Sequence, residues 1–147
     1  MQNSPTTLVR PAVVGLAVLT LAACDAGVPL EGIFAELGVD TTKIEATEAG
    51  NFIQVGTEGT GEAAVDGDRI HVLYTGWLTD GTKFDSSYNS DPPRSFPVVM
   101  GQGGAIAGFM EATNGIKVGE KRTVVMPPEQ GYGAGGQGSI PPNATLI

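Results

Sequence analysis

The side chains with the clearest chemical character are large aromatic and aliphatic ones, held between turns in two separate segments. Residues 71–87 read His-Val-Leu-Tyr-Thr-Gly-Trp-Leu-Thr-Asp-Gly-Thr-Lys-Phe-Asp-Ser-Ser and contribute Tyr74 and Phe84. A second group near the C-terminus comprises residues 127–133 and 140–146. These anchors supply no nucleophile, base or metal ligand. They therefore predict an apolar binding cleft, in which the chemistry is done by the environment.

Other kinds of active site have little support in the sequence. His71 is the only histidine and Cys24 the only cysteine, which argues against a catalytic triad, a multi-cysteine metal site and an intrachain disulfide. The glycines at 101, 103, 104 and 108 resemble a phosphate-binding loop, but no Lys-Ser/Thr pair follows them. We expect them to allow a tight turn into a helix, and we expect neither metal nor cofactor.

The elements that must position the anchors are mostly strands. Alternating apolar residues predict strands over residues 52–55, 69–78 and 121–126, and a further strand over 96–100 that Pro97 confines to an edge. Asp80-Gly81 predicts a hairpin between two strand-like runs. Residues 105–114 form the only convincing helix and end at Asn114-Gly115. This pattern predicts an α+β domain, with a curved antiparallel sheet wrapped around one short α-helix.

The first 23 residues are predicted to be a secretory signal peptide. Arg10 is followed by an apolar run that ends in Leu21-Ala22-Ala23-Cys24 and is shorter than the ~20 residues needed to span a bilayer. Cys24 could be an incidental thiol, but its place at the end of this run favours a bacterial lipobox. We therefore expect Cys24 to be acylated, for example with palmitate, and to anchor a lipoprotein to the membrane.

Residues 24–50 are predicted to be an acylated cysteine and a tether, and residues 51–147 a single globular domain. The tether segment has mixed polarity and no sustained period, although residues 33–37 could form a short helical turn between Gly32 and Gly38. The formal net charge is −8, without a basic stripe, so nucleic acid is not an expected partner. Attachment to an anionic membrane must then come from Cys24.

The two anchor segments, with Gly-Gln-Gly-Gly-Ala-Ile-Ala-Gly-Phe at residues 101–109 between them, resemble the FK506-binding (FKBP) type of peptidyl-prolyl cis-trans isomerase. The resemblance covers residues 52–147. It implies catalytic positions at Tyr74, Phe84, Asp85, Phe109 and Tyr132. It also implies substrate-binding positions at Phe96, Ala105, Ile106 and Ile140, with the Ile106 backbone N–H donating to the substrate carbonyl and Ile140 at the rim.

The bland interpretation treats these aromatic residues as core, which composition alone favours, whereas the surrounding motifs favour a pocket. Asp85 could likewise be an ordinary turn residue beside Ser86 and Ser87. Two positions depart from the family pattern. Phe109 stands where most members carry Trp, which deepens the pocket floor, and Ala105 replaces a larger aliphatic residue. The arginine that accompanies Asp85 in the family is also displaced, and Arg94 is the nearby replacement.

A further departure concerns the C-terminal end. Members of the family continue after the Ala-Thr-Leu element with a final strand in the middle of the sheet, whereas this sequence stops at Ile147. We expect that strand to be missing, through truncation or because another chain supplies it. Unpaired buried backbone groups cost ~1–3 kcal/mol each, so its loss would weaken the fold.

The resemblance implies an enzyme that accelerates isomerisation of X-Pro bonds in exported proteins, by binding proline in an apolar aromatic pocket. Its expected partners are proline-containing polypeptides, with FK506-type macrolides as inhibitors. Its expected location is the bacterial cell envelope, anchored through Cys24, with the domain facing the periplasm or the cell exterior. The alternative is a non-catalytic proline-peptide-binding module or chaperone of the envelope.

Overall fold

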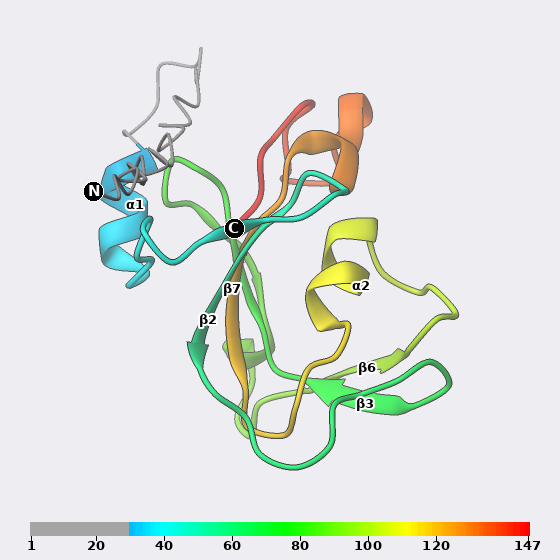
Figure 1. The fold of residues 1–147 in the computed structure, drawn as a ribbon. Coiled ribbons are helices and arrows are strands. Elements are labelled where there is room, and N and C mark those ends of the chain that lie inside the picture. Colours follow the sequence, from blue (N-terminus) through cyan, green and yellow to red (C-terminus); the bar gives the residue numbers. More distant parts are fainter. Residues whose placement is uncertain (1–29) are drawn as a thin grey trace, which may run out of the picture.

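A computed structural model describes residues 30–147 of the chain (Figure 1). It contains three small antiparallel sheets. The first has the order β1-β2-β7, with β1 at Glu45–Ala46, β2 at Phe52–Thr57 and β7 at Lys121–Val125. The second pairs β3 (Arg69–Val72) with β6 (Phe96–Val99), and the third pairs β4 (Thr75–Trp77) with β5 (Lys83–Ser86).

Two short α-helices accompany these sheets, α1 at Leu30–Glu36 and α2 at Ala107–Thr113. Three 3₁₀ turns, η1 (Ser87–Asn89), η2 (Pro128–Gln130) and η3 (Gly133–Gly135), connect or follow the strands. The predicted α+β class is confirmed, as is the predicted helix, which is trimmed to seven residues. Within residues 51–147, α2 is the one α-helix, as expected, and α1 lies before them, where the sequence left a short helical turn open.

Strand β7 lies between α1 and α2 in Figure 1. Because successive side chains of a strand point to opposite faces, β7 can contact both helices. Val124, and Met126 just beyond the end of β7, face α2 and join a buried cluster with Ala112. Val125 faces the other way and joins a second cluster with Ile33 and Phe34 of α1. Each helix is shorter than the ~12–15 residues an isolated helix needs in water, so this packing stabilises both.

The α1 cluster corrects the prediction of a tether for the part of residues 24–50 that follows Leu30. Ile33, Phe34 and Val39 are only 3%, 7% and 9% exposed and pack against Val125 and Ile147. Farther along, Asp40 N–H donates to Gln54 Oε1 at 2.6 Å, and β1 pairs with β2. The side chains at 33, 34 and 39 belong to one buried cluster. The sequence did not indicate this packing, because the segment around Gly32 and Gly38 has no sustained apolar period. The predicted signal peptide and Cys24 lie outside the described residues.

The predicted strand over residues 69–78 is broken into β3 and β4. The break lies at Leu73 and Tyr74, where the chain exchanges β6 for β5 as its partner. Tyr74 N–H donates to Ser87 Oγ at 3.1 Å, and Tyr74 C=O accepts from Ser87 N–H at 2.8 Å. These two bonds tie the Tyr74 backbone to Ser87, the first residue of η1. They lie at the point where the chain changes from pairing with β6 to pairing with β5.

Local turn chemistry fixes the predicted hairpin. Gly81 joins β4 to β5 with φ of 85°, a left-handed conformation that glycine adopts without strain. Leu78 N–H donates to Thr82 C=O, and Thr82 N–H donates to Asp80 Oδ1, both at 2.8 Å. The hairpin prediction from Asp80-Gly81 is confirmed.

Leu146 and Ile147 lie between Met126 and the end of β4. Leu146 exchanges two backbone hydrogen bonds with Met126, at 2.8 and 2.9 Å, and Ile147 exchanges two with Trp77 at the same distances. Leu146 is 2% exposed and belongs to the cluster below α2. These two residues therefore link the β4–β5 hairpin to the sheet that contains β7.

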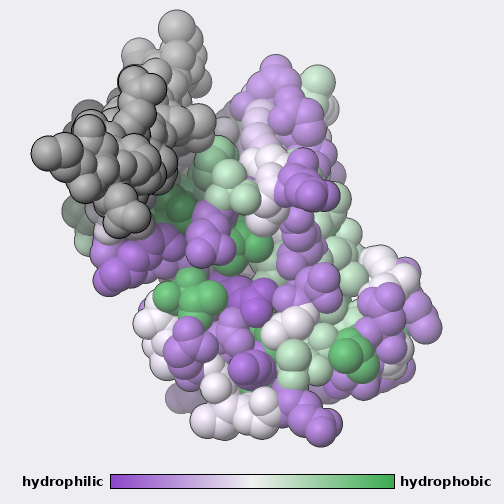
Figure 2. Space-filling model, in the orientation of Figure 1, coloured by the Kyte–Doolittle hydropathy of each residue, from purple (hydrophilic) through white to green (hydrophobic). Residues whose placement is uncertain are grey.

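The face shown in Figure 2 intersperses hydrophilic residues with separate hydrophobic ones, as suits a chain of net charge −8. No helix within residues 30–147 is long and apolar enough to cross a membrane.

Replacing Ile33 by Ala should lower the stability of the protein by about 2–4 kcal/mol, because it removes a buried side chain and leaves a cavity beside Val125. Urea unfolding followed by circular dichroism measures the change. Ala35→Ser, on the exposed side of the same helix, is the matched control and should change stability little. Equal, negligible effects of both variants would show that α1 does not pack on the domain.

Candidate active site

The predicted site residues come together around one cavity of about 1650 Å³, lined by residues of β3 to β7 and of α2. Eight of the nine predicted residues line it: Tyr74, Phe84, Asp85, Phe96, Ala105, Ile106, Phe109 and Tyr132. They come from β5, β6 and α2 and from three loops, between β3 and β4, before α2, and between η2 and η3. Trp77, Leu146 and Val124 also line the cavity.

The ninth residue, Ile140, is placed differently from the prediction. It does not line the cavity, and it is 7% exposed within the core cluster that contains Leu146 and Met126. Its backbone N–H and C=O both bond to Gln137, at 2.8 and 3.0 Å, which closes a tight loop and turns the side chain inward. The rim position predicted for Ile140 is therefore corrected to a core position.

Three aromatic rings form the apolar end of the cavity. Tyr74, Phe96 and Phe109 meet pairwise edge to face, with centroids 5.7–6.1 Å apart and interplanar angles of 77–87°. Such pairs are each worth about 0.5–1.5 kcal/mol beyond the burial of their area. Because one ring comes from each of three segments, this contact fixes α2 relative to β6 and to the loop between β3 and β4.

A glycine that the sequence reasoning passed over holds the fourth ring in place. The Phe84 ring lies directly on Gly76 of β4, where a Cβ atom would approach Phe84 Cζ to 2.4 Å. Gly76 is buried and its backbone is ordinary, so close approach is what requires glycine here. A glycine inside a predicted strand is a signal for such an approach and could have identified it.

Tyr74 and Asp85 supply the polar edge of the pocket. The Tyr74 hydroxyl donates a hydrogen bond to Asp85 Oδ2, while Asp85 Oδ1 accepts from Ser86 N–H at 2.8 Å. Burial, and then the bond to the Asp85 carboxylate, raise the pKa of Tyr74 to about 12. The phenol therefore remains a donor throughout the physiological pH range.

This shift has a defined effect on stability. The folded protein keeps the Tyr74 proton at pH values where an unfolded tyrosine, with a pKa near 10.0, loses it. The phenol therefore favours the folded state fully below pH 10, and this contribution is lost as the pH rises towards 12.

The expected substitute for the family arginine does not reach Asp85. Within residues 30–147, Asp85 forms no ion pair with Arg94, although both line a second hollow of about 410 Å³ beside Tyr74. Arg94 is held by its backbone N–H, which donates to Ser87 C=O at 2.9 Å. His71 is exposed, with Nδ1 3.1 Å from Ser95 Oγ.

The start of α2 presents a backbone donor to the pocket. Ile106 precedes the helix in an extended conformation, with φ of −61° and ψ of 151°. Its C=O accepts from Phe109 and Met110, whereas its N–H makes no hydrogen bond within the described part of the chain. That N–H is available to a carbonyl group bound against the aromatic rings. Within the same residues, no group of three or more His, Cys, Asp or Glu side chains could hold a metal ion.

Comparison with known proteins shows to which family the chain belongs. The sequence profile of the FKBP-type peptidyl-prolyl cis-trans isomerases matches residues 60–147, which contain all nine predicted site positions. The chain belongs to this family.

Individual relatives of the family agree with this assignment. The chain is 50% identical over 91 residues to the FK506-binding protein of Neisseria meningitidis serogroup B, an alignment covering 61% of this chain and 82% of that protein. It is 41% identical over 104 residues to the isomerase FkpA of Escherichia coli K12, covering 71% of this chain but only 37% of FkpA. The chain is an isomerase by family, and the remainder of FkpA has no counterpart in this alignment.

Solved structures of family members have the same fold. The crystal structure of FkpA from Escherichia coli matches with a TM-score of 0.64 and 34% identity, covering 80% of this chain and 53% of FkpA. The crystal structure of AtFKBP13 matches with a TM-score of 0.61 and 32% identity, covering 70% of this chain and 90% of that chain. The predicted FKBP-like fold is thereby confirmed.

Titration of the tyrosines by ultraviolet absorbance tests the Tyr74–Asp85 contact. One of the three tyrosines should titrate near pH 12, and Asp85→Asn should lower its pKa, because the carboxylate no longer accepts the hydrogen bond or repels the phenolate. Tyr74→Phe should remove this titration altogether. Asp66→Asn, at an exposed residue that does not line the cavity, serves as the control and should leave the curve unchanged.

Proposed function

We propose that the aromatic end of the cavity binds the proline of X-Pro segments in exported proteins and accelerates their cis–trans isomerisation there. The single observation that carries this proposal is the edge-to-face group of Tyr74, Phe96 and Phe109. It provides an apolar wall of the kind that a pyrrolidine ring can contact on several sides. An adjacent backbone N–H, that of Ile106, can receive the carbonyl group of the bound segment.

The chemistry needs no proton transfer. Rotation about a peptide bond meets a barrier of ~18–20 kcal/mol, because resonance gives the C–N bond partial double-bond character. The twisted transition state has lost that resonance and much of its charge separation. An apolar pocket disfavours the dipolar planar state relative to the twisted one, so removal of water lowers the barrier. Cis and trans X-Pro forms differ by only about 1 kcal/mol, so the enzyme acts on the rate.

Each pocket residue has a proposed role in this process. The rings of Tyr74, Phe96 and Phe109 exclude water from the proline, and Phe84 closes one side from above Gly76. Tyr132 is 37% exposed and lies where a bound segment would enter. The Asp85 carboxylate, which is exposed, keeps the Tyr74 phenol in one orientation.

The size of the pocket floor supports binding of bulky ligands. Phe109 is smaller than tryptophan and Ala105 has only a methyl group, so both leave room at the junction of α2 and the preceding loop. We propose that FK506-type macrolides bind this chain in the same place as proline and inhibit it. The N. meningitidis relative, named for FK506 binding, supports this proposal.

The proposed place of action rests on the N-terminal sequence. An apolar run that ends in Leu21-Ala22-Ala23-Cys24 supports export, followed by acylation of Cys24 and attachment to the membrane of a bacterial envelope. The clients would then be polypeptides folding outside the cytoplasm. Between Cys24 and α1 only a few residues remain, so the domain would act close to the membrane surface.

A protease-coupled assay with a Leu-Pro or Phe-Pro test peptide examines the isomerase function. The purified protein should accelerate cis-to-trans conversion, and an FK506-type macrolide should abolish the acceleration. Phe109→Ala should lower kcat/KM by about tenfold, the effect of losing about 1.4 kcal/mol of transition-state stabilisation. Val55→Ala, on an exposed β2 position, is the control. Saturable peptide binding without any rate enhancement would favour a non-catalytic binding module instead.

Membrane attachment can be tested by substituting Cys24. In a bacterial host, the wild-type protein should fractionate with membranes and incorporate labelled palmitate, whereas Cys24→Ser should lose the label and appear in the soluble fraction. Asp25→Asn is a suitable control, since it leaves the cysteine intact. Unlabelled wild-type protein in the soluble fraction would contradict the proposed anchor.

A further inference from the structure

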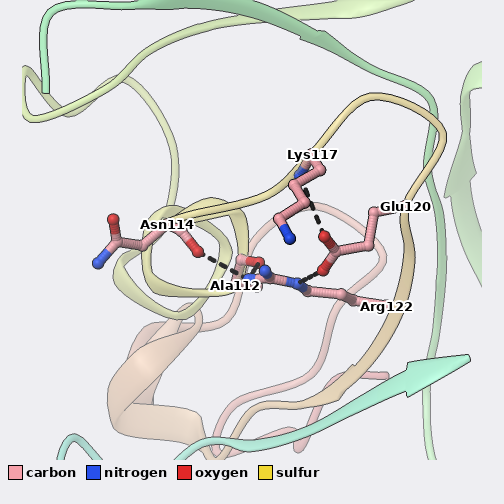
Figure 3. A network of polar contacts seen from close by, with 5 residues as sticks. All are labelled: Ala112, Asn114, Lys117, Glu120 and Arg122. Atoms are coloured by element: carbon pink, nitrogen blue, oxygen red, sulfur yellow. Dashed lines mark hydrogen bonds and ion pairs between the residues drawn. The ribbon is translucent and has the colours of Figure 1, made fainter. Parts of the chain in front are cut away.

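The C-terminal end of α2 is held by an arginine from another element. Arg122 lies on β7, and its Nη1 donates to two carbonyl groups, Ala112 C=O at 2.9 Å and Asn114 C=O at 2.7 Å (Figure 3). Both acceptors belong to the last turn of the helix or to the residue that follows it. One side chain therefore satisfies two of the carbonyl groups that the end of a helix leaves without intrahelical donors.

This contact supplies what the sequence of α2 lacks. The helix has no basic residue in its last turn, and Asn114 ends it in an extended conformation. A positive charge near a helix C-terminus is favourable, because the partial negative charges of the last carbonyls converge there. The guanidinium of Arg122 provides that charge, from a strand 8 residues later in the sequence than its acceptor Asn114.

Glu120 in turn fixes the guanidinium. Arg122 Nε donates to Glu120 Oε1 at 2.5 Å, and Glu120 Oε2 accepts from Lys117 N–H at 3.1 Å. The side chains of Arg122 and Glu120 are only 16% and 4% exposed. Burial opposes the charged form of Glu120, but the bonds from Arg122 and Lys117 outweigh it and leave its pKa lowered. The ion pair is therefore intact at neutral pH.

The contact of Arg122 with the C-terminal end of α2 lies on the same short helix as Phe109, the residue at the pocket floor. A helix of seven residues is only about 10 Å long, so a shift of its C-terminal turn moves Phe109 as well. Phe109 C=O is also bonded to Thr113 Oγ1 at 3.2 Å, which ties the pocket residue to the turn that Arg122 holds. The Phe109 ring makes two of the three contacts in the aromatic group.

We propose that Arg122, oriented by Glu120, is a positioning residue for isomerisation, which fixes the Phe109 ring by holding the C-terminal end of α2. Its effect on catalysis passes through the helix, and the proposal rests on the isomerase function described above. A purely structural role would lower stability without a selective effect on the pocket.

A double-mutant cycle tests this role. In the full chain, Arg122→Met should lower kcat/KM by about tenfold and Arg122→Lys by about threefold, since lysine keeps the charge but loses the planar fork. In the Phe109→Ala background, Arg122→Met should change kcat/KM by less than about twofold, because the residue through which it acts is gone. An effect equally large in both backgrounds would overturn the proposal.

Ile33→Ala is the matched control, because it destabilises the opposite face of β7 without contacting α2. It should lower Tm at least as far as Arg122→Lys does, yet leave kcat/KM within about twofold when measured at a temperature where all variants are folded. If Arg122→Lys changes Tm alone, as this control does, then Arg122 is structural only.

An activity-independent measurement separates this proposal from the proposed function. In NMR spectra of the folded proteins, Arg122→Lys should shift the Phe109 ring and Ile106 methyl resonances more than those of exposed Tyr88. These shifts should appear even if the wild-type protein accelerates no proline peptide. Unshifted Phe109 and Ile106 resonances would overturn the positioning role, whatever the activity.

Discussion

Strand β7 directs successive side chains to opposite faces, and both helices depend on that alternation. Val125 receives α1 on one face, whereas Arg122, Val124 and Met126 support α2 and the pocket on the other. Because neighbouring side chains along one strand serve two different layers, a displacement of β7 would be felt in both. The backbone of β7 is in turn held by pairing with β2 and, beyond its end, by the bonds between Met126 and Leu146.

The pocket is defined mainly by the positions of its aromatic rings. Its rings come from separate segments, and the groups that fix them are small or remote: a glycine beneath Phe84, a carboxylate on the Tyr74 hydroxyl and a guanidinium at the end of α2. The polar groups of this region lie around the cavity walls, where they orient apolar side chains. This arrangement suits a reaction in which the protein stabilises a twisted bond and exchanges no proton with it.

Features governed by local chemistry could be predicted from the sequence. The hairpin at Asp80-Gly81, the helix ending at Asn114 and the strands at β2, β6 and β7 all follow from turn residues and alternation. The family resemblance predicted nine site residues, and eight of them line one cavity. Features that depend on contacts distant in sequence could not be predicted in the same way. The break at Tyr74 requires Ser87, the burial of Ile140 requires Met126, and the packing of α1 requires Val125.

Gly76 and Arg122 illustrate the same limit. A strand glycine signals that something approaches closely, but only the structure shows that the neighbour is the Phe84 ring. A basic residue on a strand reads as a solvated side chain, until the carbonyls of Ala112 and Asn114 are found beside it.

The phenylalanine at the pocket floor has one more consequence. With Phe109 in that place, Trp77 is the single tryptophan of the chain, and it lines the same cavity as the aromatic group. All indole emission from the protein thus originates at one wall of the binding space, without a second fluorophore of that kind to obscure it. The molecule carries its own optical reporter of whether the cavity is filled with water or with a ligand.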